Sequence, residues 1–245
     1  MTKTVCALGA AALALAACDQ GIVNDTAPVP PAATPGATVV PASAGGTNYV
    51  EQVVQTPEGG TRMGNPNARV KLVEYLSLTC PTCARFSEEA SAALRDRYVA
   101  SGDVSYEIRH LVLNGLDASA VLLARCGGAG PFFPIVEQLY ATQPEWIGRV
   151  TPAVQQSIAA APPAQQFAAL AQAAGLDSFV RMRGVPAARA SQCLSDPAAA
   201  QRLVDGNQAA ARQGATATPT FFINGERADA ATWAQLEPLI QAELR

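Results

Sequence analysis

The sequence contains very little histidine and lysine, and this scarcity limits the chemistry that it can support. His110 is the single histidine among 245 residues, so a metal site or a catalytic cluster that needs two histidines is excluded. Lys3 and Lys71 are the two lysines, and 17 basic residues stand against 20 acidic ones, for a formal net charge of −3. Nucleic-acid binders carry a strongly basic surface, so we expect no nucleic-acid partner. Charged residues make up 15% of the chain and hydrophobic residues 49%, which is enough to bury a sizeable core.

The sequence also lacks an apolar run of the roughly 20 residues that a membrane-spanning helix needs. Its longest run, Val5 to Ala17, has about 13 residues and suits the hydrophobic region of a signal peptide. The run ends in Leu15-Ala16-Ala17-Cys18, which resembles the lipobox of bacterial lipoproteins, where cleavage precedes a cysteine that carries lipid. We therefore expect residues 1–17 to be a lipoprotein signal peptide and Cys18 to be the lipidation site. An ordinary secretory signal is the alternative. Asp19 resembles a signal for retention at the inner membrane.

Residues 18–48 form a segment rich in Pro, Ala, Thr, Gly and Ser, with no hydrophobic period. Such a segment cannot bury enough apolar surface to offset the entropy lost on ordering. We predict a lipid-anchored tether, with a loosely packed N-terminal arm as the alternative. The folded part is then expected to span residues 49–245.

The order of helical and strand patterns in the folded part indicates one α/β domain. Residues 70–77 and 104–111 have the pattern of strands, with a helical pattern at 81–100 between them and a weaker strand pattern at 49–55. A block of helical patterns follows, and the chain then returns to a strand, a turn and a last helix. The helical block is predicted to insert into the α/β domain at about 114–213. The segments after residue 111 are helices near 116–127, 132–142, 152–160, 164–174 and 197–212, a strand at 219–224 and a helix at 230–244.

Cys80-Pro-Thr-Cys83 places two cysteines between a predicted strand and a predicted helix. The first turn of a helix presents unpaired N–H groups and a partial positive charge, which favour the thiolate of Cys80. A lowered pKa makes Cys80 both a ready nucleophile and a good leaving group. Cys83, one turn further along, is expected to be more buried and to resolve the exchange. Pro81 fits the start of the helix because its missing N–H has no helical partner there.

Three other uses of this cysteine pair have to be weighed. A zinc site needs about four ligands, and Cys126, Cys193 and His110 include no second pair with this spacing. A structural disulfide without turnover is a second alternative. A hydrolase that uses Cys80 with His110 is a third, but it leaves the spacing of the cysteines unexplained. We expect no metal, and we predict that His110 is a core or rim histidine with satisfied hydrogen bonds.

Two runs of the sequence resemble a known family. Val73–Cys83 (VEYLSLTCPTC) and Ala217–Gly225 (ATPTFFING) closely resemble DsbA-like thiol–disulfide oxidoreductases of the thioredoxin superfamily. The resemblance covers roughly residues 62–244. It implies a thioredoxin-like fold with a helical insertion domain, and no cofactor other than the redox-active disulfide between Cys80 and Cys83.

The resemblance also implies roles for single residues. Cys80 would be the attacking cysteine and Cys83 its partner. Pro219 would be a cis-proline packed against the disulfide, and Thr218 would offer backbone hydrogen bonds to a substrate peptide. Glu74 would be the buried acid that assists proton transfer to Cys83. The alternative is that Glu74 lies on an edge strand and faces water.

The residues between the cysteines bear on the direction of exchange. Pro81 and Thr82 are expected to contact substrate. DsbA has a histidine where Thr82 stands, and a threonine donates a hydrogen bond but carries no positive charge. We expect a disulfide donor, and a disulfide isomerase or reductase is the alternative.

Cys126 and Cys193 remain as a second pair. In an oxidising periplasm, such a leftover pair suggests a structural disulfide. Some DsbA-like proteins carry a second disulfide in the helical region, which this pair resembles. Two separate buried thiols are the alternative.

These expectations combine into a lipoprotein of the periplasm, anchored to the inner membrane, that exchanges disulfides. Its substrates would be unfolded or newly exported cysteine-containing proteins. Its redox partner in the membrane would be DsbB-like if the protein oxidises and DsbD-like if it reduces. A monomer is favoured because residues 19–48 are too short for a dimerisation domain. A non-catalytic peptide-binding or chaperone module is the alternative from another class.

Overall fold

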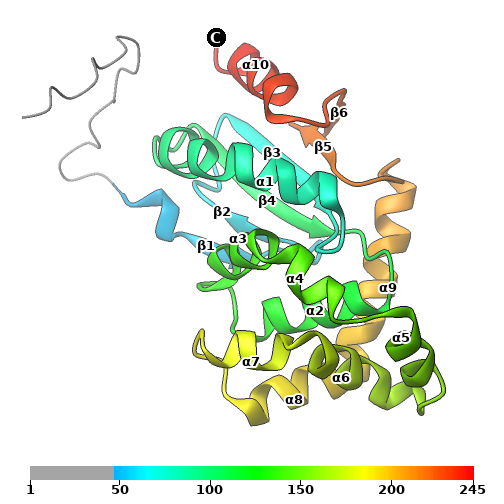
Figure 1. The fold of residues 1–245 in the computed structure, drawn as a ribbon. Coiled ribbons are helices and arrows are strands. Elements are labelled where there is room, and N and C mark those ends of the chain that lie inside the picture. Colours follow the sequence, from blue (N-terminus) through cyan, green and yellow to red (C-terminus); the bar gives the residue numbers. More distant parts are fainter. Residues whose placement is uncertain (1–46) are drawn as a thin grey trace, which may run out of the picture. The chain divides into compact units, whose positions relative to one another are not determined.

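The computed structural model describes residues 47–245 (Figure 1). The expectations of a signal peptide at residues 1–17 and of a lipidated Cys18 lie outside the described residues. So does nearly all of the expected tether at 18–48.

A six-stranded mixed sheet forms the centre of the fold, with the strand order β1-β2-β4-β3-β5-β6. β3 runs parallel to β4 and antiparallel to β5, and the other neighbouring pairs are antiparallel. This mixed sheet with helices around it confirms the predicted α/β class. The strands are β1 (Val53–Gln55), β2 (Thr61–Met63), β3 (Val70–Leu76), β4 (Val104–His110), β5 (Thr220–Ile223) and β6 (Glu226–Ala228).

β3 lies in the interior of the sheet, and this position decides how Glu74 is placed. Glu74 pairs with Ile108 of β4 on one side and with Phe221 of β5 on the other. Its side chain is buried. The alternative of an edge-strand residue that faces water is therefore wrong.

Helices from both ends of the domain pack over the sheet (Figure 1). α1 (Pro81–Ala93) continues into π-helical turns (η2, Leu94–Val99), as the helical pattern at 81–100 predicts. The last helix, α10 (Trp233–Glu243), packs beside α1. The ring of Phe86 lies 4.6 Å from the ring of Phe221 in β5 and 6.5 Å from that of Trp233, measured between centroids. Aromatic packing therefore fixes α1 between the sheet and the C-terminal helix.

Eight helices separate β4 from β5 and correspond to the insertion expected at about 114–213. α2 is their centre, because it contacts α3, α6, α7, α8 and α9 and is buried along most of its length. Figure 1 shows these helices below the sheet, with α9 (orange) leading back toward β5. The helices are α2 (Gly115–Cys126), α3 (Phe132–Ala141), α4 (Gln143–Gly148), α5 (Pro152–Ala159), α6 (Pro163–Ala174), α7 (Leu176–Arg181), α8 (Ala187–Ser195) and α9 (Pro197–Arg212).

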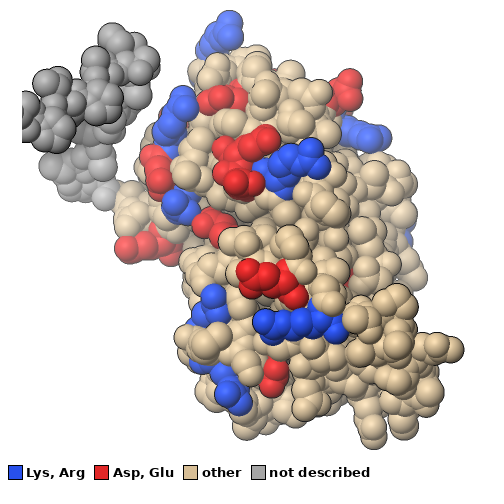
Figure 2. Space-filling model, viewed as in Figure 1, with Lys and Arg blue, Asp and Glu red and all other residues tan. Residues whose placement is uncertain are grey.

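Charge is spread unevenly over the insertion. The sequence has no acidic or basic residue between Arg149 and Asp177, a range that contains α5 and α6. Figure 2 shows this uncharged region as a wide tan surface at the lower right, while mixed charges are scattered over the rest of the same face. Across residues 47–245, no helix has the length and hydropathy needed to cross a membrane.

The structure corrects the prediction of a strand at 49–55. Tyr49–Glu51 forms a 3-10 turn (η1), and only Val53–Gln55 is a strand. The Gln52 N–H donates to the Tyr49 carbonyl over 3.1 Å, which closes the turn. The short elements β2, β6, α4, α7 and α8 were not predicted from the sequence.

Cys126 and Cys193 form a disulfide, with Cα atoms 5.9 Å apart. The bond joins the last residue of α2 to α8. The second pair is therefore bonded, and the alternative of two separate thiols does not hold.

Candidate active site

Cys80 and Cys83 lie where β3 leads into α1. Cys80 is the N-cap residue of α1, with an extended backbone, and Pro81 begins the helix. Both cysteines are free thiols. Cys80 is 8% exposed and Cys83 is fully buried, so the two sulfur atoms differ in access to solvent as the sequence predicted. Beside Cys80, Pro81 is exposed and Thr82 is half-buried.

The surroundings split the pKa values of the two thiols. A hydrogen bond from Cys83 is the main reason why the pKa of Cys80 falls from 9.0 to about 5. Burial opposes this shift, while Thr218 and the backbone N–H groups of Cys83 and Thr82 support it. Burial is the main cause that raises the pKa of Cys83 far above its ordinary value, and the Cys80 hydrogen bond and the Glu74 charge add to it. Near neutral pH, Cys80 is therefore a thiolate and Cys83 a thiol.

The loop before β5 faces the same sulfur atom. The Thr218–Pro219 peptide bond is cis, as the resemblance implies. The Thr218 carbonyl oxygen lies 3.4 Å from Cys80 Sγ. Residues 138 positions apart in the sequence thus meet at the thiol.

Glu74 is an acid inside the sheet whose charge raises the pKa of Cys83 and whose own pKa is raised by the charge of Cys80. The Tyr106 hydroxyl donates a hydrogen bond to Glu74 Oε2. Burial raises the pKa of Glu74 from 4.5 to about 8, against the lowering effect of Tyr106 and with a smaller rise from the charge of Cys80. Glu74 therefore holds a proton at neutral pH while the pair is reduced. A cavity of about 10 Å³ lies beside it, lined also by Ser87 and Glu137. This is about the space that one water molecule needs.

The helical insertion holds the loop that carries Cys80, through residues whose contacts the sequence pattern does not predict. The Gln143 side chain, at the start of α4, donates to the carbonyl oxygens of Leu78 and Cys80 over 2.8 and 3.1 Å. The Tyr140 hydroxyl donates to the Ser77 carbonyl over 3.0 Å. These side chains satisfy backbone groups that are buried next to the thiol.

Asp117 supports the same loop from the first turn of α2. Its carboxylate is buried and accepts hydrogen bonds from the backbone N–H groups of Leu78 and Leu113, each over 2.9 Å. Burial raises the pKa of Asp117. The preceding Asn114 caps α2 by accepting from the Asp117 N–H, a pattern typical of a helix start. That cap was the available signal in the sequence, but it does not reveal a contact with a loop 39 residues away.

His110 contradicts the prediction of a histidine with satisfied hydrogen bonds. It is buried at the end of β4 with its ring 5.8 Å from that of Phe132, and neither ring nitrogen has a hydrogen-bond partner among the described residues. Burial, assisted by the charge of Arg125, lowers the pKa of His110 to about 3. Its apolar surroundings keep the ring neutral.

A low-pKa cysteine at a helix start, a buried partner, a cis-proline loop and a buried acid together define a thioredoxin-fold thiol site. The sequence profile of the thioredoxin family matches residues 56–242. The chain therefore belongs to the thioredoxin family.

Two solved structures illustrate the likeness. A protein-disulfide isomerase from Novosphingobium aromaticivorans is 31% identical, with a TM-score of 0.71, and the match covers 76% of this chain and 98% of that one. Alpha-DsbA1 of Wolbachia pipientis is 20% identical with a TM-score of 0.63, covering 79% of this chain and 94% of that one. At 20% identity, the second likeness concerns the fold alone. It confirms the predicted thioredoxin-like fold with a helical insertion.

Curated relatives extend beyond the matched region. A Rickettsia prowazekii protein named "Putative protein-disulfide oxidoreductase" is 27% identical over 165 residues, which is 66% of this chain and 53% of that protein. The chain thus matches about half the length of the curated relatives.

Proposed function

We propose that the protein is a thiol–disulfide oxidoreductase acting on cysteine-containing proteins. The observation that carries this proposal is the opposite shift of the pKa values of Cys80 and Cys83, with the Cys80 sulfur facing the cis-proline loop. Cys80 is a thiolate that can attack and leave, and Cys83 stays protonated in the reduced pair. A structural disulfide without turnover would need neither feature.

When the protein donates its disulfide, the exchange proceeds through two successive attacks by thiolates of the substrate. A substrate thiolate attacks Cys80 Sγ, the bond between Cys80 and Cys83 breaks, and the Cys83 thiolate takes the proton of Glu74. A second substrate thiolate then attacks the substrate sulfur of the mixed disulfide, and Cys80 leaves as a thiolate. The substrate has lost two electrons to the Cys80–Cys83 pair and two protons to solvent. One proton returns from solvent to Glu74 and replaces the one that Cys83 took, so the reduced pair again has a protonated Glu74 beside it.

The low pKa of Cys80 supports the donor direction. Stabilising the thiolate stabilises the reduced pair, and a stabilised reduced form makes a stronger oxidant. The second candidate is a disulfide isomerase or reductase, and the name of the relative from Novosphingobium supports the isomerase. Both candidates use the same site, so the redox potential has to decide between them.

The deciding experiment is the redox equilibrium of the purified protein in glutathione buffers, with free thiols trapped by alkylation and counted by mass. A potential of about −120 mV, like that of DsbA, supports the donor. A value of about −270 mV, like that of thioredoxin, contradicts it and supports a reductase.

A non-catalytic peptide-binding or chaperone module remains the candidate from another class. Reduction of insulin by dithiothreitol separates it from an enzyme. The oxidoreductase accelerates the reaction, and Cys80→Ser abolishes the acceleration. Prevention of insulin aggregation that persists in Cys80→Ser without any acceleration would favour the chaperone.

We further propose that the protein faces the periplasm, anchored by lipid on Cys18, with a DsbB-like membrane partner if it oxidises. The sequence Leu15-Ala16-Ala17-Cys18 at the end of an apolar run supports this location. Metabolic labelling with palmitate tests it. The wild type and a Cys6→Ser control should be labelled, and Cys18→Ser should not; label retained in Cys18→Ser contradicts the anchor.

A further inference from the structure

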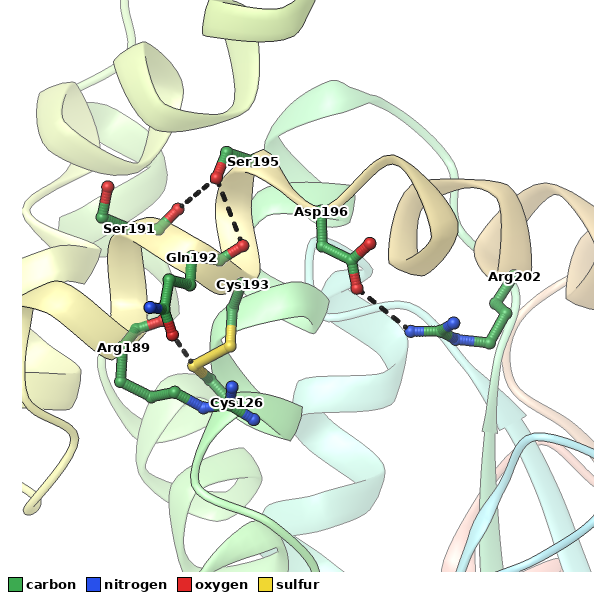
Figure 3. The surroundings of a disulfide bond; sticks show 8 residues. All are labelled: Cys126, Arg189, Ser191, Gln192, Cys193, Ser195, Asp196 and Arg202. Carbon is green, nitrogen blue, oxygen red and sulfur yellow. Dashed lines mark hydrogen bonds and ion pairs between the residues drawn. A yellow bond between two sulfur atoms is a disulfide. The ribbon is translucent and has the colours of Figure 1, made fainter.

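A pocket of about 400 Å³ lies against the Cys126–Cys193 disulfide (Figure 3). The site on Cys80 is near the start of α2, and this pocket is near its end, with Arg125 and Cys126 in its lining. A helix of 12 residues is about 18 Å long, so the pocket is separate from the cysteine pair of α1. Nothing in the thiol exchange uses it.

Arginines dominate the polar lining of this pocket. Arg125 of α2, Arg189 of α8 and Arg202 of α9 all line it, against a single carboxylate, Asp196. In Figure 3, Arg189 extends beneath the disulfide and Arg202 points toward Asp196. Three positive groups and one negative group leave an excess of two positive charges in the pocket.

The one carboxylate is already engaged. Asp196 Oδ1 accepts the backbone N–H of Ala198 over 2.9 Å and so caps α9. Its Oδ2 pairs with Arg202 over 3.4 Å. Within residues 47–245, neither Arg125 nor Arg189 has an ion-pair or hydrogen-bond partner for its guanidinium group. Their donors are therefore available to a ligand.

Of the three arginines, Arg125 gives the strongest indication of an anionic ligand. It is half-buried, so its unpaired charge is partly removed from water. Burial, and then the charge of Arg202, lower the pKa of Arg125, so these two guanidinium groups repel each other. Arginine nevertheless stays protonated in proteins. Placing like charges around a half-buried guanidinium is unfavourable unless an anion enters between them.

We propose that this pocket binds a phosphate monoester group. A phosphate monoester carries close to two negative charges and three terminal oxygen atoms on one compact centre, and these match the excess charge and the three guanidinium groups. A carboxylate has one charge and two oxygen atoms and leaves one arginine unmatched. The amide groups of Gln55 and Gln192 in the lining can donate to the rest of the ligand.

The proposal is independent of the thiol–disulfide activity and is tested by binding. The full-length protein is titrated with inorganic phosphate and with glycerol 3-phosphate by calorimetry, at an ionic strength held constant with chloride. Arg125→Gln and Arg202→Gln should each weaken the affinity at least about tenfold, as expected for a charge-assisted hydrogen bond. Arg202 is exposed, so its replacement leaves the fold intact. Arg212→Gln is the matched control, because Arg212 is exposed on the same helix about 15 Å further along.

Two comparisons can overturn the proposal. Succinate binding as tightly as glycerol 3-phosphate would show that the pocket does not select phosphate. Equal affinity in the wild type, Arg125→Gln and Arg202→Gln would show that phosphate binds elsewhere or only through ionic strength.

A vesicle experiment identifies the source of the phosphate. Vesicles that contain phosphatidic acid are compared with pure phosphatidylcholine, using the wild type and Arg202→Gln. Additional binding to phosphatidic acid that Arg202→Gln removes supports the proposal, with a lipid headgroup as the ligand. Binding of the soluble phosphates alone supports it with a free metabolite.

Discussion

The molecule contains two pairs of cysteines whose surroundings differ in almost every respect. Cys80 and Cys83 are free thiols three residues apart at a helix start. Cys126 and Cys193 are bonded across a separation of 67 residues and join two helices. The first pair has a buried acid and a cis-proline loop beside it. The second has an arginine-lined pocket beside it.

This difference shows that the redox reactivity of a cysteine pair depends on the residues around it and not on cysteine alone. At the first pair, the surroundings lower the pKa of Cys80 and raise that of Cys83, so one sulfur is ready to attack and to leave while the other keeps its proton. At the second pair, the bond closes a long loop, which restricts the unfolded chain. Each of the predictions below removes one of these features.

The largest expected effect is on catalysis by the first pair. Cys80→Ser removes the thiolate that attacks and leaves, so we expect the acceleration of insulin reduction to be abolished. Turbidity of reduced insulin with dithiothreitol measures it. Cys83→Ser is the informative partner variant, because it keeps the attacking sulfur and should accumulate a mixed disulfide that is visible by mass. Acceleration that survives in Cys80→Ser would move the activity to another residue.

The second effect is on stability and concerns the second pair. Replacing both Cys126 and Cys193 by alanine releases a loop of 67 residues, which lowers the free energy of unfolding by about 4 kcal/mol in the chain-entropy treatment. For a chain of this size, we expect the melting temperature to fall by roughly 10 °C. Scanning calorimetry measures the change. Insulin reduction should continue at 25 °C, and its loss would show that the second pair serves the first.

The third effect concerns Glu74 and its dependence on pH. The pKa of Glu74 is raised from 4.5 to about 8, so the folded state favours its protonated form. This contribution to stability is complete below pH 4.5 and is lost as the pH rises through 8. Cys80 acts in the opposite sense, because its pKa falls from 9.0 to about 5 and its contribution grows between these values. Only a variant of Glu74 therefore isolates the effect of the acid.

Glu74→Gln is that variant, because glutamine cannot ionise. Relative to the wild type, the reduced variant should gain about 5 kcal/mol of stability between pH 4.5 and 9. Urea unfolding in the presence of a reductant at a series of pH values measures the gain. Glu88→Gln, at an exposed position on α1, is the control and should follow the wild type. A constant difference between Glu74→Gln and the wild type across this range would mean that Glu74 does not titrate there.

The same comparison shows which parts of the site the sequence could predict. The strand pattern before Cys80 and the proline after it are local, so the start of α1 follows from a dozen residues. Gln143 is different, because its side chain donates to the Leu78 carbonyl 65 positions away in the sequence. The local sequence pattern cannot predict such a contact. The sequence also does not predict that the His110 ring lacks hydrogen-bond partners. A sequence shows which groups need hydrogen bonds but not where their partners lie.

The smallest expected effect comes from Tyr106, and it tests the surroundings without touching either cysteine or the acid. The Tyr106 hydroxyl donates to Glu74 and lowers the pKa of that carboxyl, against the stronger effect of burial. Tyr106→Phe removes the donor, so the ionised carboxylate loses a stabilising partner and the pKa of Glu74 should rise above 8 by about one unit or less. Carbon-13 NMR of the labelled glutamate carboxyl groups in the reduced protein measures the midpoint.

Tyr98→Phe is the matched control, because its hydroxyl donates to Glu237 over 2.8 Å and not to Glu74. It should leave the midpoint of Glu74 where it is in the wild type. A midpoint that falls in Tyr106→Phe would mean that the tyrosine disfavours the carboxylate, and the assigned direction of the hydrogen bond would be wrong. A rise confined to Tyr106→Phe would show that a single neutral hydroxyl sets part of the pKa of Glu74, the group that gives its proton to Cys83. The reactivity of the first pair would then depend on a residue of β4 that makes no covalent contribution to the exchange.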